Sequence, residues 1–144
     1  MCAAVLILVG VTSWASDAFG VWKLNAALSR GAGNEKSVIL RIEPHNRGEV
    51  LTFDILAADG RASTSSTILY LDGKARDFQD SACSGTQSSR RVDSRTVEIQ
   101  RVCEYGRRFR LIRRVERPGV LILEVTEDNS EGRHFGRRLV LEKH

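Results

Sequence analysis

Turn-forming residues recur along the chain at intervals of about a dozen residues, and this spacing constrains the fold more than any other feature. β-Branched and alternating segments lie between the turns. Short strands between evenly spaced turns are typical of an antiparallel meander, and closing a meander into a barrel removes its exposed edges. We therefore predict an all-β, up-and-down antiparallel β-barrel of about 8–10 strands. The turns are Asn46-Arg47-Gly48, Asp59-Gly60, Asp72-Gly73, Tyr105-Gly106, Pro118-Gly119 and the stretch from Asn129 to Gly132.

The segments between the turns predict the positions of the strands. A connection follows the first strand, and Asn25 is placed to cap a helical turn at residues 26–28. Two of the later strands are expected to pair as a hairpin around Ser94-Arg95. After the N-terminal segment no stretch shows the periodicity of a helix. The predicted strands are 20–25, 36–45, 49–57, 61–71, 74–79, 86–93, 96–104, 107–116, 120–127 and 134–143.

The N-terminal segment has the pattern of an export signal. Residues 3–11 form an uncharged apolar run, and Ser13 and Ala15 provide the small residues that a signal peptidase requires. The run is shorter than the roughly 20 residues that span a bilayer. No Lys or Arg precedes it, so a truncated start and an unusual signal both stay open. We predict a signal peptide at 1–15, a barrel domain at 16–144, and a periplasmic or secreted location.

Two cysteines, Cys83 and Cys103, remain after the predicted cleavage. In an oxidising compartment an even pair of cysteines can form a disulfide bond. Such a bond would close a loop of about 20 residues and stabilise the fold by roughly 3 kcal/mol. Cys83 lies in a Ser- and Gly-rich turn, whereas Cys103 lies in a predicted strand. We expect the bond to tie the turn to the sheet, with two buried free thiols as the alternative.

The start of the first predicted strand carries a family resemblance. Gly20-Val21-Trp22 resembles the Gly-x-Trp opening of the lipocalins and their calycin relatives, and residues 20–29 resemble the start of small secreted bacterial lipocalin-like proteins. The resemblance implies a lipocalin- or fatty-acid-binding-protein-like barrel. Because large aromatic side chains often fill the ends of barrels, we interpret Trp22 as a structural plug. The resemblance also implies that a basic residue of the last strand, Arg137 or Arg138, packs over Trp22. Further similarities are Asp59-Gly60, Leu71-Asp72-Gly73-Lys74, Arg91-Val92-Asp93 before Thr96-Val97-Glu98, and the closing Glu142-Lys143.

Three predicted strands each carry one arginine on their apolar face, because side chains two residues apart point the same way. The apolar face of a small barrel usually points inward, where an unpaired guanidinium is costly. One interpretation is a ligand with a carboxylate or phosphate head. The alternatives are pairing with protein carboxylates such as Asp54, Glu98 or Glu124, and solvation at the barrel mouth. The candidate ligand-binding residues are Arg101, Arg113, Arg137, Phe109 and Phe135, although Arg137-Arg138-Leu139 lacks the Tyr of the fatty-acid-binding-protein carboxylate clamp.

Other side chains give weaker signals. Ser63, Ser65 and Thr67 share one strand face, which we interpret as solvated, with a polar cavity wall as the alternative. The outward arginines favour contact with an anionic lipid or an envelope polymer over nucleic acid, which an exported protein rarely meets. These arginines are Arg108, Arg110, Arg114 and Arg138.

No pattern indicates catalysis. The three histidines, His45, His134 and His144, are dispersed in the sequence, and a metal site needs three or four donors. There is no nucleophile elbow and no glycine-rich phosphate loop. We therefore expect no metal, no cofactor and no enzymatic activity.

The combined prediction is an exported monomeric barrel that binds a small apolar ligand, with an acidic head group as an option. The alternative is a structural or interaction module of the cell envelope whose barrel is filled by side chains. An internal cavity of about 300 Å³ or more would favour the ligand-binding protein.

Overall fold

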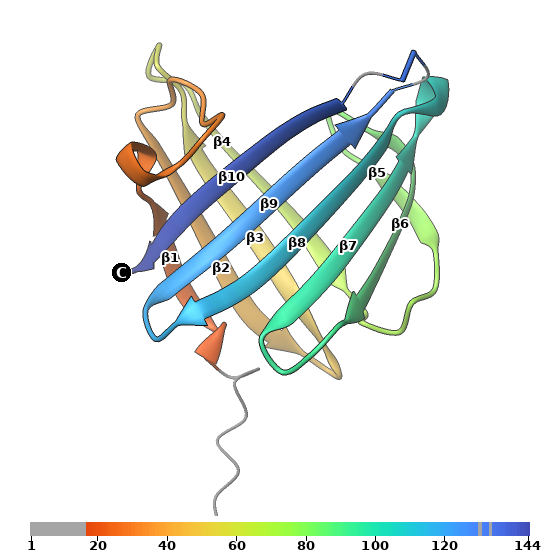
Figure 1. The fold of residues 1–144 in the computed structure, drawn as a ribbon, viewed down its shortest axis with the longest axis horizontal. Coiled ribbons are helices and arrows are strands. Elements are labelled where there is room, and N and C mark those ends of the chain that lie inside the picture. The colour runs from red at the N-terminus through yellow and green to blue at the C-terminus, as the bar shows by residue number, and fades with distance from the viewer. Residues whose placement is uncertain (1–16, 130, 133) are drawn as a thin grey trace, which may run out of the picture.

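The structure of the chain is a computed structural model that describes residues 17–129, 131–132 and 134–144. The predicted signal peptide lies outside the described residues. Ten strands follow one another along the chain, and all ten match strands that the turn spacing predicts (Figure 1). They are β1 (Gly20–Leu24), β2 (Ser37–His45), β3 (Gly48–Leu56), β4 (Ala62–Leu69), β5 (Arg76–Gln79), β6 (Ser84–Arg91), β7 (Thr96–Cys103), β8 (Arg108–Arg117), β9 (Val120–Asp128) and β10 (His134–Lys143).

Two short 3-10 turns lie between strands: η1 (Ala26–Leu28) follows β1, and η2 (Glu104–Gly106) follows β7. The Asn25 side chain accepts a hydrogen bond from the backbone N–H of Leu28 at 3.3 Å, so the predicted cap of the first turn is confirmed. In the described ranges, neither turn has the length or the apolar character that a membrane-crossing helix needs.

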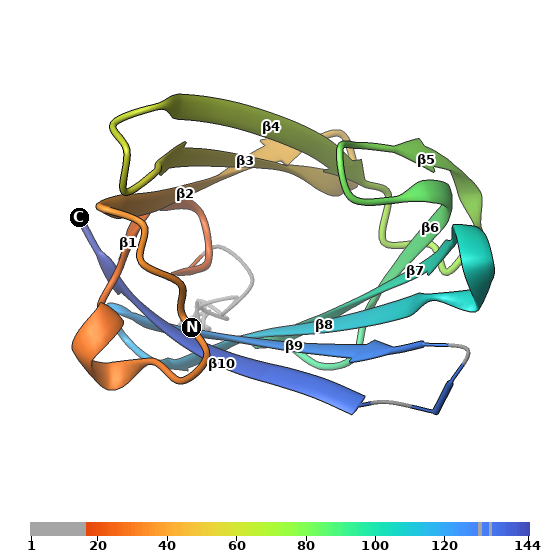
Figure 2. The ribbon, with the colours of Figure 1, turned by 90° about the horizontal axis from the view of Figure 1, so that it is seen from above.

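The ten strands form one antiparallel sheet in the order β4-β3-β2-β1-β10-β9-β8-β7-β6-β5. The sheet curls until the first strand pairs with the last, with Trp22 opposite Lys143 (Figure 2). This confirms the predicted up-and-down antiparallel barrel. The closure is incomplete, however, because the hydrogen-bonded ladder stops at β4 and β5, which are the two edges of the described sheet.

Side chains and loop backbone bridge part of the opening between β4 and β5. The Gln87 side-chain amide donates to the hydroxyl of Thr67 at 2.9 Å. The backbone N–H of Leu71 donates to the Ser89 hydroxyl at 3.0 Å, and that of Gly73 donates to the Ser89 carbonyl at 2.8 Å. The barrel is therefore held together here by a few individual contacts rather than by a strand ladder.

Apolar side chains fill one end of the barrel. Trp22 is fully buried there, and its indole N–H donates to the Ala18 carbonyl at 2.8 Å. The expectation that Arg137 or Arg138 covers Trp22 is wrong: the covering cation is Lys143, whose Nζ lies 5.3 Å from the ring centroid. The register explains the difference, since Lys143 is the residue of β10 directly opposite Trp22. The other buried apolar residues of this end include Leu40, Ile42, Leu69, Val97, Ile99, Leu121 and Leu141.

The predicted disulfide bond is present between Cys83 and Cys103, with 5.1 Å between the Cα atoms. It joins the loop between β5 and β6 to the last residue of β7. Both cysteines are buried. The bond therefore fixes a loop at the barrel end opposite the Trp22 core.

Candidate functional site

The end of the barrel opposite Trp22 is hollow. It contains a cavity of about 300 Å³, bounded at its rim by parts of the loops at 31–35 and 80–83. On β2 to β4 and on β7 to β10, the inward side chains nearest the Trp22 end are packed together, and those nearer the loops at 31–35 and 80–83 face the cavity. On β9, for example, Leu121 is fully buried, whereas Leu123 and Val125 line the space. The barrel is therefore packed with side chains at one end and contains a cavity at the other.

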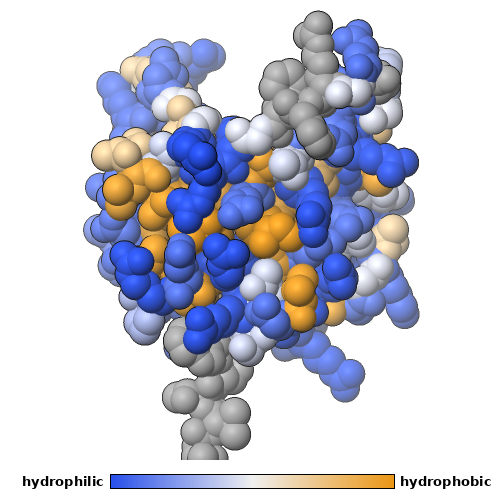
Figure 3. All heavy atoms as spheres, viewed as in Figure 1, coloured by the Kyte–Doolittle hydropathy of each residue, from blue (hydrophilic) through white to orange (hydrophobic). Residues whose placement is uncertain are grey.

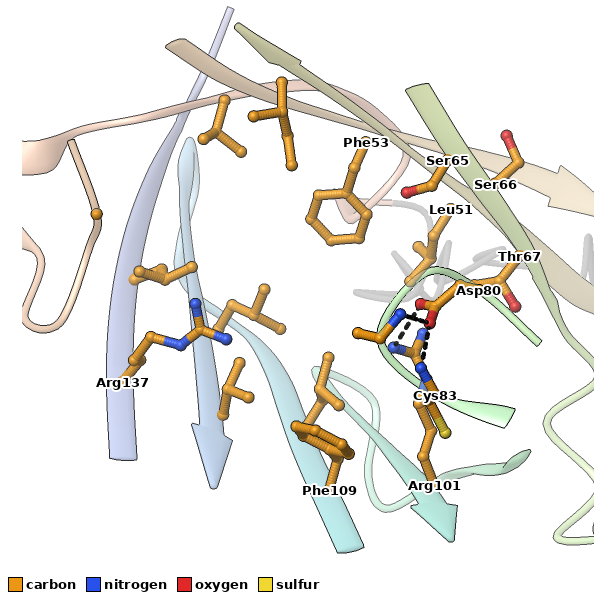
Figure 4. Close-up of a pocket in the computed structure, with 18 of the residues that line it drawn as sticks. Leu51, Phe53, Ser65, Ser66, Thr67, Asp80, Cys83, Arg101, Phe109 and Arg137 are labelled. Atoms are coloured by element: carbon orange, nitrogen blue, oxygen red, sulfur yellow. Dashed lines mark hydrogen bonds and ion pairs between the residues drawn. The ribbon is translucent and has the colours of Figure 1, made fainter. Parts of the chain in front are cut away.

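One side of the cavity is mainly apolar and the other is mainly polar. The apolar wall comes from β3 and from β8 to β10, where alternate residues are large and hydrophobic. The polar wall comes from β4 and from the region of β5 to β7. The apolar members are Leu51, Phe53, Phe109, Leu111, Leu123, Val125 and Leu139, and the polar members are Ser65, Thr67, Asp80 and Arg101 (Figure 4).

Two hydroxyl residues of β4 form a polar wall of the cavity, which was the alternative to a solvated strand face in the sequence analysis. Thr67 and Ser65 stand opposite Leu51 and Phe53 of β3, and both line the cavity. They also remain partly or largely exposed, because β4 is an edge strand of the described sheet. Ser63 continues the same face but is not among the residues that line the cavity.

Arg101 of β7 is the less exposed of the two arginines that line the cavity, with 18% of its side chain exposed. Its Nε donates to the Gln87 side-chain oxygen at 2.8 Å. Its guanidinium carbon lies 4.3 Å from the ring centroid of Phe78. Its Nη1 lies 3.9 Å from a carboxylate oxygen of Asp80. Burial lowers the pKa of the Arg101 guanidinium, and the Asp80 charge offsets part of that effect.

Asp80 was not predicted as a site residue, yet it organises one rim of the cavity. Its Oδ1 accepts the backbone N–H groups of Ala82 at 2.8 Å and Cys83 at 2.7 Å. Its own N–H donates to the Cys83 carbonyl at 2.9 Å. An Asp followed by such a turn is a known local motif, so the sequence did contain this signal. What the sequence did not show is that the turn stands beside Arg101.

Arg137 of β10 lines the opposite side of the cavity and is exposed (Figure 4). Its aliphatic stem packs against Gly31: a Cβ atom placed on Gly31 would lie 2.7 Å from the Arg137 Cγ. The segment that contains Gly31 is held to β10 by two backbone hydrogen bonds between Arg30 and Arg138, at 2.8 and 2.9 Å. The glycine thus leaves room for Arg137 to lie along the rim.

The two predicted phenylalanines differ in what the structure describes. Phe109 of β8 lines the cavity directly opposite Arg101 in the strand register. The guanidinium of Arg107 lies 5.1 Å from the Phe109 ring centroid. The backbone of Phe135 pairs with Glu127, but its side chain lies outside the described part of the chain.

Arg113 lies in the packed end of the barrel and does not line the cavity. Only 2% of its side chain is exposed, and both of its terminal nitrogens donate to the carboxylate of Glu49, which is 1% exposed. The bond from Nη2 is 2.9 Å long. Arg91 approaches the same carboxylate at 3.4 Å. Arg113 thus pairs with a protein carboxylate, as the sequence analysis allowed, but its partner is Glu49, which the sequence did not identify.

The outward arginines lie on a surface that also carries acidic and hydrophobic side chains. Figure 3 shows hydrophilic side chains spread over the face formed by β7 to β10, with hydrophobic ones between them. Arg110 pairs with Glu98 at 3.0 Å, and Arg90 reaches the same carboxylate at 3.3 Å. Together with the Gln100 amide, these cations lower the pKa of Glu98 in spite of its burial. Arg138 lies 3.6 Å from Glu116.

No protein-family model and no curated protein matches the sequence. Solved structures do match the fold. The fluorescent protein UnaG superimposes with a TM-score of 0.58 at 14% sequence identity, over 90% of this chain and 98% of that one. A point mutant of UnaG gives a TM-score of 0.57 at 14% identity, over 90% and 97% of the two chains. The protein EF1p2_mFAP2b, bound to DFHBI, gives 0.50 at 9% identity, over 92% and 98%. The ten-stranded antiparallel sheet and these neighbours together place the chain in the lipocalin- and fatty-acid-binding-protein-like β-barrel fold.

Proposed function

We propose that this protein is a non-catalytic binding protein that encloses a small, largely apolar molecule carrying an acidic group. The observation that carries the proposal is the half-filled barrel. Trp22 and its neighbours form a cluster of buried side chains at one end, whereas the other end keeps a cavity of about 300 Å³. Ligand pockets in proteins begin at about this volume and combine apolar walls with a few polar groups.

The side chains of the cavity support this ligand chemistry. Phe53, Phe109 and the aliphatic residues around them offer an apolar surface for the body of the ligand. Arg101 and Arg137 supply the only arginine side chains among the described residues that line this cavity. Guanidinium groups bind carboxylates through charge-assisted hydrogen bonds. The structure of EF1p2_mFAP2b with DFHBI shows a small molecule bound by a protein of similar fold, which is consistent with the proposal.

A bulky residue in the cavity should abolish binding without unfolding the barrel. We expect Val125→Trp to weaken binding of the apolar anionic dye 1-anilinonaphthalene-8-sulfonate by at least about tenfold, because the indole would occupy the ligand space. Thr126→Trp is the matched control, since Thr126 is the next residue of β9 but is exposed and does not line the cavity. Fluorescence titration measures both, and urea unfolding verifies that the variants fold. Unchanged dye binding in Val125→Trp would contradict the proposal.

We further propose that the protein works after export, as a monomer in the periplasm or outside the cell. The Cys83–Cys103 disulfide bond supports an oxidising compartment, and the sequence pattern of residues 1–15 supports a cleaved signal. Protein recovered from its own host should begin near Ser16. Its intact mass without reductant should be two hydrogens below that of the reduced chain. A mature protein that retains residues 1–15 would contradict export through this signal.

A further inference from the structure

The two arginines of the cavity differ in whether a carboxylate of the protein already faces them. Arg101 lies beside Asp80, with 3.9 Å between Nη1 and the nearer carboxylate oxygen. Arg137 lies on the opposite wall (Figure 4), and it forms no ion pair with any residue that the structure describes. Of the acidic residues near it, Glu127 is bound by Arg107 at 3.0 Å, and Glu35 lines the cavity without pairing with Arg137. Of the two arginines that line the cavity, Arg137 is therefore the one that pairs with no carboxylate of the described residues.

Asp80 is fixed in its place beside Arg101. Its Oδ1 accepts two backbone N–H groups of the loop, and that loop is tied to β7 by the Cys83–Cys103 bond. Arg107 also holds the loop, by donating to the Ala82 carbonyl at 3.0 Å. Asp80 cannot turn away without losing these hydrogen bonds. An anion bound at Arg101 would thus remain next to a fixed carboxylate, and two carboxylates that share a site repel each other.

The surroundings of Arg101 suit an uncharged polar group better than an anion. Arg101 and Asp80 together carry no net charge. Gln87 bonds to Arg101 and, across the opening, to Thr67, so these side chains already form a connected polar group. The guanidinium has donors beyond its Nε, and the second oxygen of Asp80 accepts no hydrogen bond from the residues that the structure describes; it lies 3.9 Å from Arg101 Nη1. A hydroxyl, which both donates and accepts, can use both kinds of group.

We infer that the ligand lies across the cavity, with its acidic group on Arg137 and with an uncharged hydrogen-bonding group on the opposite wall, between Arg101 and Asp80. This inference rests on the proposed function and makes it more specific. The ligand class is an apolar acid that carries a hydroxyl or a similar neutral group at the end away from the carboxylate. Gly31 is a positioning residue in this arrangement, because its missing side chain leaves room for the stem of Arg137.

The test compares three probes with the same alkyl chain: decanoate, decan-1-ol and 10-hydroxydecanoate. Isothermal titration calorimetry measures their dissociation constants near neutral pH and at low ionic strength. The wild type should bind 10-hydroxydecanoate more tightly than decanoate. Arg137→Gln should weaken both acids by about threefold to tenfold and leave decan-1-ol unchanged, and the effect should shrink as salt is added, because Arg137 is exposed.

Two variants of the opposite wall serve as matched comparisons. Arg101→Gln should remove the advantage of 10-hydroxydecanoate over decanoate while changing decanoate itself by less than about twofold. Asp80→Asn keeps an oxygen to accept the two loop N–H groups but removes the charge, so it should increase the affinity for decanoate. Gly31→Ala should lower the affinity for both acids in the same direction as Arg137→Gln, with no change in net charge.

The inference is overturned if Arg101→Gln weakens decanoate more than Arg137→Gln does. It is also overturned if Asp80→Asn leaves the preference between decanoate and decan-1-ol unchanged. Both results require that the probes bind the wild type, so they leave the proposed function intact. If the folded wild type and the folded Asp80→Asn variant bind none of the three probes, the proposed function itself fails and the inference falls with it.

Discussion

Replacing Glu49 with glutamine is expected to lower the free energy of unfolding by about 3–5 kcal/mol. The carboxylate of Glu49 is the only one that the structure places against the buried guanidinium of Arg113 among the described residues. Glutamine keeps the shape but removes the charge, so Arg113 would be left as an uncompensated cation inside the packed end. Urea unfolding followed by Trp fluorescence measures the change, with Trp22 as a reporter in the same core.

Two further variants distinguish the loss of the Glu49 charge from a general destabilisation of β3 by substitution. Asp54→Asn breaks an ion pair of the same strand, with Arg41 at 2.8 Å, but that pair is solvent-exposed and its loss should matter far less. Replacing Glu49 and Arg113 together by methionine removes both charges and should recover much of the loss, because buried ion pairs are often no more stabilising than apolar residues of similar volume. Equal losses in Glu49→Gln and Asp54→Asn would contradict the assignment.

Removing the disulfide bond is expected to cost about 3 kcal/mol, since the closed loop spans a sequence separation of 20 residues. The double variant Cys83→Ser with Cys103→Ser tests this by urea unfolding of both proteins without reductant. The same loop carries Asp80, so its amide protons should also exchange faster in the variant.

Reductant provides the control for the disulfide experiment. It should destabilise the wild type by a similar amount and leave the double variant unchanged. A wild type whose stability does not respond to full reduction, verified by thiol counting, would show that the bond adds little to the fold.

The strand positions could be predicted because turn chemistry and side-chain alternation are local properties. Asn46-Arg47-Gly48 and Pro118-Gly119 mark strand ends without reference to the rest of the chain, and β2 to β3 and β8 to β9 do meet at these turns. The pairing of β1 with β10 follows from the topology of any such meander that closes. The family resemblance was right about a cation over Trp22 but pointed to the wrong residue, because cross-strand register depends on loop lengths that the sequence does not reveal.

The candidate site was only partly predictable for the same reason. Strand alternation placed Arg101, Arg113 and Arg137 on inward faces, but alternation does not say how deep along the barrel each residue lies. The three arginines differ in their position along the barrel. Arg113 lies beside Glu49 in the packed end, whereas Arg101 and Arg137 line the cavity. Asp80 was missed because its role depends on the contact between a loop and a strand about twenty residues later.

The unpaired edges of β4 and β5 have a consequence for guests of different size. The circumference of a fully closed β-barrel depends on its number of strands. Such a barrel can widen only if the hydrogen bonds between two neighbouring strands break. Here the sheet can spread along one seam at the loss of contacts such as that between Gln87 and Thr67. A second, outer pocket lies along the same seam and shares Ser66, Thr67, Phe78 and Gln79 with the cavity, so we expect spreading of this seam to enlarge the cavity.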